Sequence, residues 1–353
     1  MGTHKRLKMN KTITIAHGNG GKENNDLIKS IFYKHFKNEI LECSEDAAVL
    51  GLTSDDNASA LSPAGLTLPV AMTTDSFTVS PLFFPGGDIG KLAVCGTCND
   101  LAMMGARPQY LTCSVIIEEG FSVRELEKIV RSMKQELDVN GAMIVSGDTK
   151  VVPKGSVDKL FINTTGIGRV EQEGISASGL QEGMSILVSR DVGAHGACIF
   201  AAREGITLES DLVTDCASLF PQVEALIEAG IAIKAMRDAT RGGIAAVLNE
   251  WAKSSSICIE VEEERIPVNE QVQGICEMLG FEAVNLANEG TFVLCVPKEE
   301  ETKALEVLRQ THESAAVIAT VTTQYEGRVI LNSSWGTKRF LDLPTGELLP
   351  RIC

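Results

Sequence analysis

The chain has 353 residues, a formal net charge of −15 at pH 7 and 44% hydrophobic residues. This length predicts two domains, because a single core rarely organises more than about 250–300 residues. The acidic charge argues against binding to a nucleic-acid backbone, which needs clustered Lys and Arg. No apolar run reaches the roughly 18 residues of a membrane span, and the run at 13–16 is too short and mixed for a signal-peptide core. We therefore expect a cytoplasmic protein.

The first motif is a glycine-rich turn that contains Gly18, Gly20, Gly21 and Lys22, and the apolar spacing after it predicts a helix over 25–36. Backbone N–H groups of such a turn can bind phosphate. The turn is not a P-loop, because Lys22 lacks the required glycine spacing and a following Ser or Thr. A flexible glycine-rich linker is the alternative.

Acidic residues then border apolar runs at Asp46 and Asp75, and a helix is predicted over 88–104. Asn99 and Asp100 lie within the apolar part of that helix. A buried carboxylate is costly unless it is paired or binds a metal, so Asp100 is a candidate functional residue.

The same helix carries a Cys-x-x-Cys motif, Cys95 to Cys98, in a chain with ten cysteines. The motif has no second pair, and the five histidines lie at no ligand spacing to it, which argues against zinc. A disulfide framework is not expected in a long cytoplasmic chain. A redox role for the pair is the alternative to simple burial.

A strand is predicted over 109–117, a helix over 122–141 that opens with a capping box, and a strand over 142–145. The last strand leads into Asp148 and Lys150, so an acid and an amine are predicted at a strand end. A turn is one interpretation of this motif, and a phosphate or metal site is the other.

Another strand is predicted over 157–170, and the polar residues 171–179 predict a domain boundary. The second half again alternates strands and helices. Its most conspicuous loop, Met236–Gly243, leads into a predicted helix, where two glycines permit close approach of an anion and the helix dipole favours negative charge. Glu289 stands between two apolar runs, where it either bounds a strand or has a functional role.

The chain ends at Cys353, which carries both a thiol and the terminal carboxylate. Pro344 and Pro350 fix φ and remove backbone donors, so neither a helix nor a central strand is expected there. Extended at about 3.3 Å per residue, a tail of residues 334–353 would span tens of ångströms and reach a cleft on its own or a partner subunit. An accidental exposed cysteine is the alternative.

Five aspartates thus lie at element ends, namely Asp46, Asp75, Asp100, Asp148 and Asp238. Carboxylates gathered in one site repel one another, and Mg²⁺ ions that bridge to the phosphates of a nucleotide relieve that repulsion. From the residues alone, we therefore expect a metal-dependent, ATP-using enzyme without a P-loop.

Segments from both halves together resemble the HypE-type hydrogenase maturation proteins. They are Ala16–Gly21, Thr74–Ser76, Pro81–Lys91, Gly147–Val152, Arg237–Gly243, Asn288–Gly290 and the ending Pro350–Cys353. The resemblance spans Ile15 to Cys353 and extends to a superfamily with aminoimidazole ribonucleotide synthetase, selenophosphate synthetase and thiamine phosphate kinase. It departs at Glu45, where relatives in the superfamily often carry Asp.

The resemblance implies an α+β, two-domain aminoimidazole ribonucleotide synthetase-like fold. Residues 1–12 would be an N-terminal extension, 13–170 an ATP-binding and dimerisation domain, 171–333 a C-terminal α/β domain, and 334–353 a mobile tail. The N-terminal domains would pair into a dimeric β-barrel, so the resemblance implies a homodimer.

The resemblance also implies a reaction. A HypF-type carbamoyltransferase would place a carbamoyl group on Cys353, and this chain would use ATP and Mg²⁺ to dehydrate the resulting S-carboxamide to a thiocyanate. The cyano group would pass to iron in a HypC–HypD-type complex, which supplies the cyanide ligands of the NiFe-hydrogenase.

The matched motifs carry the implied site residues. Cys353, Glu289 and Lys150 would be catalytic, with Glu289 as general base and Lys150 holding developing negative charge or phosphate. ATP would be bound by Gly18, Gly20, Gly21, Lys22, Asn99, Asp148, Thr240, Arg241, Gly242 and Gly243. Metal ions would be bound by Asp46, Asp75, Asp100, Asp148 and Asp238, and Glu45 is left out of this set.

Two rival functions stay open. A small-molecule phosphotransferase or synthetase, as in the sister families, would leave Cys353 unexplained. A carrier that presents a thiol and binds ATP only as a conformational ligand would not form ADP with loss of one water from the tail.

Overall fold

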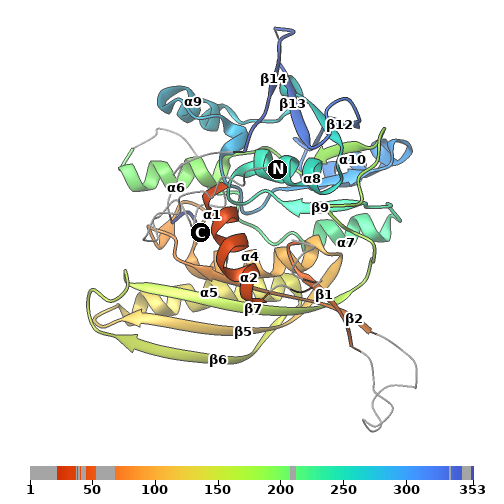
Figure 1. The fold of residues 1–353 in the computed structure, drawn as a ribbon. Helices are drawn as coiled ribbons and strands as arrows, with labels where there is room; N and C mark the ends of the chain where they lie inside the picture. The colour runs from red at the N-terminus through yellow and green to blue at the C-terminus, as the bar shows by residue number, and fades with distance from the viewer. Residues whose placement is uncertain are drawn as a thin grey trace, which may run out of the picture.

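The computed structural model describes residues 22–36, 38, 40, 45–52, 68–206, 212–333, 335–343 and 351–353. The predicted ATP ligands Gly18, Gly20 and Gly21 lie outside these residues, as does the predicted extension 1–12. Two β-sheets with their covering helices organise the described chain (Figure 1). Within the described residues, no helix combines the length and the apolarity that crossing a membrane requires.

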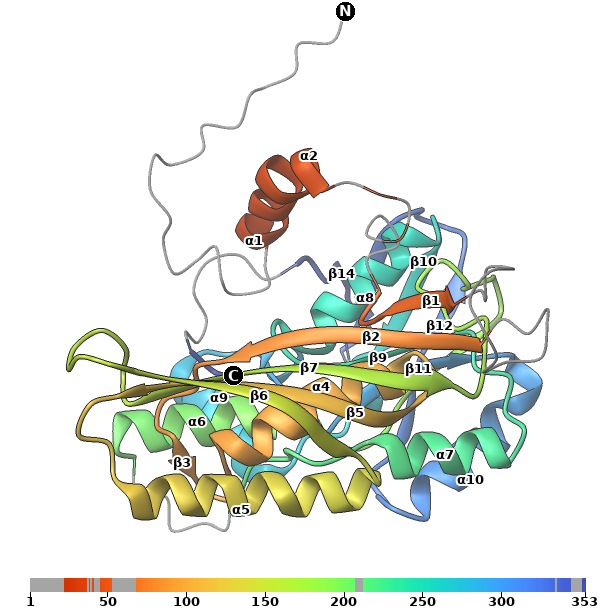
Figure 2. The same ribbon diagram turned by 90° about the horizontal axis from the view of Figure 1, so that it is seen from below.

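The first sheet has five strands in the order β1-β2-β7-β5-β6. Their bounds are β1 Ala48–Leu52, β2 Leu68–Phe77, β5 Ala106–Glu118, β6 Met143–Val152 and β7 Leu160–Val170. Neighbours are antiparallel except β5 and β6, which are parallel. Helices α4 (Ile89–Met103) and α5 (Val123–Asn140) lie on one face of this sheet (Figure 2). The predicted strands over 109–117 and 157–170 and the helix over 122–141 are confirmed, although Ser122 makes no side-chain cap bond.

Helix α4 is buried almost throughout. It begins after Asp88, whose Oδ1 accepts from the backbone N–H of Gly90 at 2.8 Å and of Lys91 at 3.0 Å. An acid at this position satisfies N–H groups that have no partner within the helix. The chain leaves α4 through Gly105 at φ 66°, a left-handed conformation that glycine adopts without strain.

The predicted helix over 25–36 is present as three consecutive pieces, α1 (Lys22–Leu27), a π-helical turn (Ile28–Phe32) and α2 (Tyr33–Phe36). In Figure 2 it stands outside the layers, on the side of β1 and β2. A short hairpin of β3 (Phe83–Phe84) and β4 (Gly87–Asp88) precedes α4.

Strand β6 corrects one prediction. The sequence pattern ended this strand at Val145 and placed Asp148 and Lys150 just beyond its end, but the strand continues to Val152. It continues because β5 offers a long parallel partner, with Asp148 opposite Ser114 and Lys150 opposite Ile116. Backbone pairing therefore outweighs the turn preference of the Ser-Gly-Asp sequence.

The second sheet has seven strands in the order β14-β13-β10-β12-β8-β11-β9. Their bounds are β8 Ser185–Val188, β9 Ala235–Asp238, β10 Cys258–Glu262, β11 Phe292–Val296, β12 Ala316–Thr322, β13 Arg328–Asn332 and β14 Lys338–Phe340. The helices around it are α6 Ala194–Glu204, α7 Phe220–Glu228, α8 Gly243–Ser254, α9 Glu270–Leu279 and α10 Glu301–Arg309, with 3₁₀ turns at Glu263–Arg265, Ala283–Asn285 and Lys298–Glu300. Strands β8 and β11 are buried along their whole length, so they form the centre of this half.

The predicted tail 334–353 is also corrected at its start. Residues 338–340 form the edge strand β14, which pairs with β13, and Leu341 is buried in the core of the second half. Gly336 at φ 76° makes the turn between the two strands. An exposed sheet edge provides unpaired backbone groups, so these residues gain hydrogen bonds by adding a strand.

The two halves meet at α4 and α7. Arg107 of β5 donates from Nε to Glu171 at 2.9 Å, forms an ion pair with Glu224 of α7 and stacks over the Phe220 ring at 4.6 Å from its centroid. The end of α4 packs at Met103 in the same apolar cluster as Phe220. Helix α4 is thus fixed by both halves, and its side chains lie at the boundary between them.

We predict that Gly90→Ala lowers the free energy of unfolding by about 1–3 kcal/mol, because an added methyl group overpacks the contact of α4 with α5. An ideal Cβ at Gly90 lies 2.4 Å from the Ile129 carbonyl oxygen. The matched control is Gly274→Ala in α9, where no atom lies within 4 Å and alanine should stabilise the helix by about 0.5–1 kcal/mol. Urea unfolding of both variants measures this, and equal midpoints would show that α4 and α5 do not approach as closely as described.

Candidate active site

Four aspartates gather where the two halves meet: Asp46 before β1, Asp75 on β2, Asp100 on α4 and Asp238 at the end of β9. Burial is the largest cause that raises the pKa of Asp100 well above its ordinary value, followed by the charges of Asp75, Asp238 and Asp46. Asp238 shows the same pattern, with burial first and then Asp46 and Asp75. The four carboxylates are therefore close enough to oppose one another's ionisation.

Strand alternation explains how β2 contributes to this group. Thr73 and Asp75 are two residues apart, so both side chains point to the sheet face that α4 covers. Thr73 Oγ1 donates to Asp100 Oδ2 at 2.7 Å, which fixes the α4 carboxylate beside β2. Burial raises the pKa of Asp75, while a hydrogen bond to Asp100 and the charge of Arg241 lower it.

The chemistry of this acidic cluster fits a hard cation that takes further ligands from elsewhere. In the described part of the chain, no three His, Cys, Asp or Glu side chains are arranged to hold a metal ion alone. Mg²⁺ needs only one or two carboxylates when phosphate oxygens and water complete its shell. Asp46 Oδ2 is buried and has no hydrogen-bond partner among the described residues, so an acceptor there is available to a cation.

Arg237 and Glu45 organise the edge of this cluster. Arg237 forms ion pairs with Asp46 and Glu250, yet burial still raises the pKa of Asp46 to about 6. Glu45 Oε1 accepts from Ser176 Oγ at 2.7 Å and from Ala177 N at 2.9 Å. The carboxylate of Glu45 thus holds a loop of the second half.

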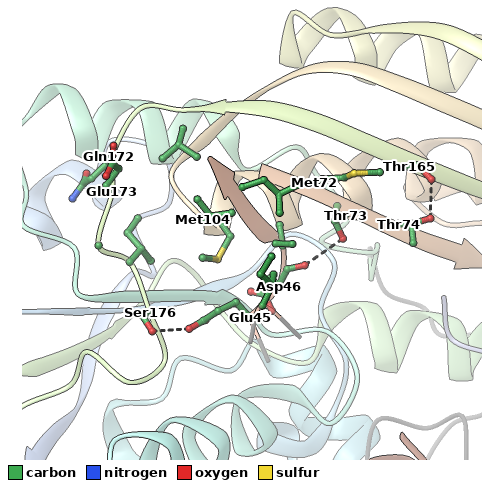
Figure 3. Close-up of a pocket in the computed structure, with 18 of the residues that line it drawn as sticks. Glu45, Asp46, Met72, Thr73, Thr74, Met104, Thr165, Gln172, Glu173 and Ser176 are labelled. Carbon is green, nitrogen blue, oxygen red and sulfur yellow. Dashed lines mark hydrogen bonds between the residues drawn. The ribbon is translucent and has the colours of Figure 1, made fainter. Parts of the chain in front are cut away.

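A cavity of about 810 Å³ borders the cluster at Asp46 and Thr73 (Figure 3). Its wall is largely apolar, and its polar rim contains Glu45, Asp46, Thr73 and Thr74. The apolar lining includes Ile40, Val49, Met72, Met104, Val170 and Ile175. Its volume lies within the roughly 300–1,000 Å³ of small-molecule sites, and an apolar wall with a few polar groups is typical of them.

The last three residues of the chain lie against the segment that follows β2. Thr78 N donates to Cys353 O at 3.0 Å, and Ser80 N donates to Arg351 O at 3.2 Å. In return, Arg351 Nε donates to Thr78 O at 2.8 Å. The end of the chain is therefore bound largely through its backbone, as in the addition of a peptide to an exposed segment.

Side chains of α6 complete this contact. His195 Nε2 lies 2.8 Å from Ile352 O, and Arg203 Nη2 donates to Arg351 O at 2.9 Å. Ile352 is only 3% exposed and belongs to the core cluster of the first half. Arg351 Nη1 forms an ion pair with Asp158 at 2.7 Å.

This docking places the terminal thiol among charged groups of both halves. Burial raises the pKa of Cys353 to about 12, Arg241 lowers it, and Glu289, Asp75 and Asp238 raise it. Conversely, Cys353 is the largest cause that raises the pKa of Arg241. The thiol is thus neutral at physiological pH while it lies beside the acidic cluster.

Glu289 is the most isolated of the nearby acids. It is 3% exposed, and its Oε1 has no hydrogen-bond partner among the described residues. Burial, followed by the charges of Asp238 and Asp215, raises its pKa well above the ordinary value, while Arg241 lowers it. A buried carboxyl group with an unpartnered oxygen is a candidate for proton transfer.

Asn288 positions this acid from the adjoining residue. Its Oδ1 accepts from Gly193 N at 2.6 Å, and its Nδ2 donates to Ala239 O at 2.8 Å. Asn99, which was predicted to bind ATP, is 1% exposed and donates from Nδ2 to Ala217 O at 3.0 Å. Its Oδ1 accepts from Leu219 N at 2.8 Å, so its amide bonds to backbone groups here.

Other predicted residues lie at two distinct places. Thr240, Arg241, Gly242 and Gly243 lie at the N-terminus of α8, where Gly242 has φ 80° and Gly243 has φ 58°. A Cβ at Gly243 would lie 2.4 Å from Val284 O, so this glycine also permits a close backbone contact. Lys22 is exposed at the start of α1.

Asp148 and Lys150 are not brought to the cluster within one chain. They lie on the edge strand β6, pair with each other at 2.8 Å and are 58% and 67% exposed at their side chains. β7 and β5 separate β6 from β2. A hydrogen bond from Lys150 lowers the pKa of Asp148.

Sequence reasoning missed the residues that bind the terminus, namely Thr78, Ser80, His195, Arg203 and Asp158. Ser80 acts through its backbone, which any residue type provides, and Thr78 acts through its backbone and through its hydroxyl, which donates to Cys353 O at 3.2 Å. His195 and Arg203 lie about two turns apart on α6, and nothing in their spacing indicates a peptide as ligand.

Models of known families match most of the chain. Residues 44–170 match the model of the AIR synthase related protein N-terminal domain, and residues 181–332 match that of the AIR synthase related protein C-terminal domain. "Carbamoyl dehydratase HypE" of Escherichia coli strain K12 is 45% identical over 347 residues, which cover 97% of this chain and 99% of that protein.

Solved structures agree with these matches. A HypE–HypF complex contains a chain 43% identical to this one, with a TM-score of 0.82 and coverage of 90% of this chain and 99% of that chain. HypE in complex with ATP is 43% identical, with a TM-score of 0.78 and coverage of 97% and 100%. The chain therefore belongs to the AIR synthase related proteins, and among them to the HypE-type hydrogenase maturation proteins.

Proposed function

We propose that this chain is an ATP-dependent carbamoyl dehydratase that acts on its own Cys353, which it converts from an S-carboxamide to a thiocyanate. The observation that carries this proposal is the docked terminus, whose sulfur lies among Glu289, Arg241 and Asp75. The name carbamoyl dehydratase of the Escherichia coli relative supports it. A phosphotransferase that acts on a free small molecule would not explain why residues 351–353 are bound by specific hydrogen bonds.

ATP is required because the oxygen of an amide is a poor leaving group. The carboxamide oxygen attacks the γ-phosphorus of ATP and ADP leaves; loss of phosphate then forms the carbon–nitrogen triple bond. The balance is S-carboxamide plus ATP to thiocyanate, ADP and phosphate. A solved relative is in complex with ATP, which supports this substrate.

The cavity beside Asp46 is our candidate for the nucleotide base, with the phosphates directed toward the acidic cluster. Arg241 and the N–H groups at the start of α8 would bind phosphate oxygens. Asp46, Asp75, Asp100 and Asp238 would hold Mg²⁺, which neutralises phosphate charge and polarises the γ-phosphate when bound. Asp148 stays a candidate ligand only through a second subunit.

Glu289 is our candidate base for the two protons that leave the carboxamide nitrogen. It must be ionised to accept a proton, and the positive charge of Arg241 is the contribution that lowers its pKa. Its burial excludes water, which protects the thiocyanate from hydrolysis. Lys150 would hold developing charge or phosphate, if a partner subunit delivers it.

The electrostatics of the cleft favour a neutral sulfur. A thiolate at Cys353 would be opposed by burial and by Glu289, Asp75 and Asp238, whereas an S-carboxamide carries no charge. Carbamoylation needs a nucleophilic thiolate, so we place that step in the undocked tail, on a HypF-type carbamoyltransferase. The HypE–HypF complex supports this partner, and we propose a HypC–HypD-type complex as the acceptor of the cyano group.

We further propose a homodimer formed through the outer face of the first sheet. Met72, Ile167, Tyr110 and Met143 pair in one row across β2, β7, β5 and β6, and each is 39–56% exposed. A contiguous exposed apolar row favours burial against another subunit. Asp148 and Lys150 lie on this same sheet, so a dimer would let one chain offer them to the other.

We predict that Cys353→Ala folds and binds ATP as the unchanged chain does but never acquires a cyano group. The reason is that the substitution removes only the sulfur that carries the carboxamide. Intact-protein mass spectrometry after incubation with a HypF-type carbamoyltransferase, its substrates and ATP measures this. A normal yield of cyanated Cys353→Ala protein would exclude the mechanism.

Asp75→Asn should weaken binding of Mg·ATP by about tenfold or more, as loss of a group that supports a metal does. Without nucleotide the same change removes a charge that opposes Asp100, Asp238 and Glu289, so it should not lower the thermal midpoint. Calorimetric titration measures the affinity, and Asp138→Asn on the exposed face of α5 is the matched control. Equal affinities for the two variants would remove Asp75 from the site.

Tyr110→Lys should raise the dissociation constant of the dimer by at least about tenfold, because it buries a charge in the apolar row. Val130→Lys, on the exposed face of α5, is the control and should leave the dimer intact. Sedimentation velocity over a range of protein concentrations measures both. The same dimer constant for the two variants would place the interface elsewhere.

A further inference from the structure

The segment Thr214–Asp215 is linked to the docked terminus through His195 on one side and contacts the loop of Glu289 on the other. Thr214 is anchored by its backbone N–H, which donates to Pro85 O at 3.0 Å. Its Oγ1 lies 2.7 Å from His195 Nδ1, and His195 Nε2 lies 2.8 Å from Ile352 O. One side chain therefore separates Thr214 from the backbone of the tail.

The hydrogen-bond network assigns the protons on this path. The Ile352 carbonyl oxygen can only accept, so His195 Nε2 carries the proton; Nδ1 of the neutral ring then accepts from Thr214 Oγ1, which itself accepts from Cys216 N at 3.0 Å. An imidazole that accepts at Nδ1 carries its proton on Nε2, which is the atom that faces the Ile352 carbonyl oxygen. Burial lowers the pKa of His195, which keeps this neutral form. Thr214 thus supports the tautomer that binds the tail.

Asp215 binds the loop that carries Glu289. Its Oδ2 accepts from Gly290 N at 3.0 Å and from Thr291 Oγ1 at 2.8 Å, and its Oδ1 accepts from Glu289 N at 3.1 Å. The residue is 2% exposed. Its carboxylate therefore fixes the backbone that carries the candidate base.

The two backbones are also in direct contact. A Cβ at Gly290 would lie 1.8 Å from Asp215 O, and Ala217 N donates to Glu289 O at 3.3 Å. Movement of one segment without the other would break these contacts. Thr214 and the backbone of Glu289 therefore belong to one contiguous set of contacts.

We propose that His195, Thr214 and Asp215 are positioning residues that couple docking of the tail to the placement of Glu289. His195 binds the backbone of the tail, Thr214 holds the His195 ring through Nδ1, and Asp215 orients the base toward the group that the tail carries. The importance of Glu289 rests on the proposed function, whereas the link between Thr214 and the docked tail does not.

The first test measures docking alone, in the full chain without nucleotide. Docking half-buries the Cys353 thiol and raises its pKa to about 12, which lowers the reactive thiolate, so alkylation by iodoacetamide follows the undocked fraction. Mass spectrometry of peptide 348–353, released by cleavage after Glu347, gives the rate. Thr214→Val should raise this rate by roughly 5–10-fold, the effect of one lost buried hydrogen bond, and Thr214→Ser should restore the rate of the unchanged chain.

His195→Phe gives a second measurement of the same contact, because it keeps an aromatic ring beside Phe84 and removes the donor to Ile352. It should accelerate alkylation as Thr214→Val does. Thermal midpoints close to that of the unchanged chain exclude unfolding as the cause. Alkylation at the unchanged rate in either folded variant would overturn the proposal.

The second test separates docking from chemistry. Asp215→Asn places an amide N–H₂ against backbone N–H groups, so the rate of ADP formation by the carbamoylated chain in a single turnover should fall by about 10-fold or more. Its Cys353 alkylation rate should change much less than in Thr214→Val. A full single-turnover rate in Asp215→Asn would overturn the role of Asp215.

Failure of this inference differs from failure of the proposed function. If Glu289→Gln dehydrates the tail normally while Thr214→Val undocks it, the assigned base is wrong and only the tail contact is supported. If Glu289→Gln is inactive while Thr214→Val leaves alkylation unchanged, the base is supported and the coupling is wrong.

Discussion

Mutual repulsion among buried carboxylates is the constraint on which the rest of this molecule depends. Asp46, Asp75, Asp100 and Asp238 come from both halves of the chain; burial opposes ionisation of each, and at Asp100 and Asp238 the other carboxylates oppose it as well. A protein tolerates such a cluster of carboxylates when a positively charged ligand binds to it during function and offsets the repulsion. The cluster therefore explains why nucleotide with its cation, and an uncharged sulfur group, suit the cleft.

The protein binds the terminus through backbone atoms that lie away from the reactive sulfur, which is compatible with that constraint. Thr78, Ser80, His195 and Arg203 bind the backbone of residues 351–353, so the contact is the same whether the sulfur is free, carbamoylated or cyanated. Net hydrogen-bond energies of about 0.5–1.5 kcal/mol each allow such a contact to open and close. This suits a tail that must visit other proteins between steps.

Much of the fold could be predicted from the sequence, because helix and strand periods are local properties. The helices over 25–36 and 122–141 and the strands over 109–117 and 157–170 are present, and Asp75, Asp100 and Asp238 do meet. The strand through Asp148 and the edge strand at 338–340 were missed, since pairing with β5 and β13 overrides local turn preference. The tail contacts were also missed, because backbone acceptors and a single buried histidine leave no pattern in sequence.

The most direct measurement is a crystal structure of the chain with a carbamoylated Cys353, Mg²⁺ and a non-hydrolysable ATP analogue. The account predicts the carboxamide oxygen about 3–3.5 Å from the γ-phosphorus, the separation of groups poised to react, with residues 351–353 against Thr78 and His195. A nucleotide bound at the acidic cluster while the carbamoylated tail lies elsewhere, in every subunit, would contradict it.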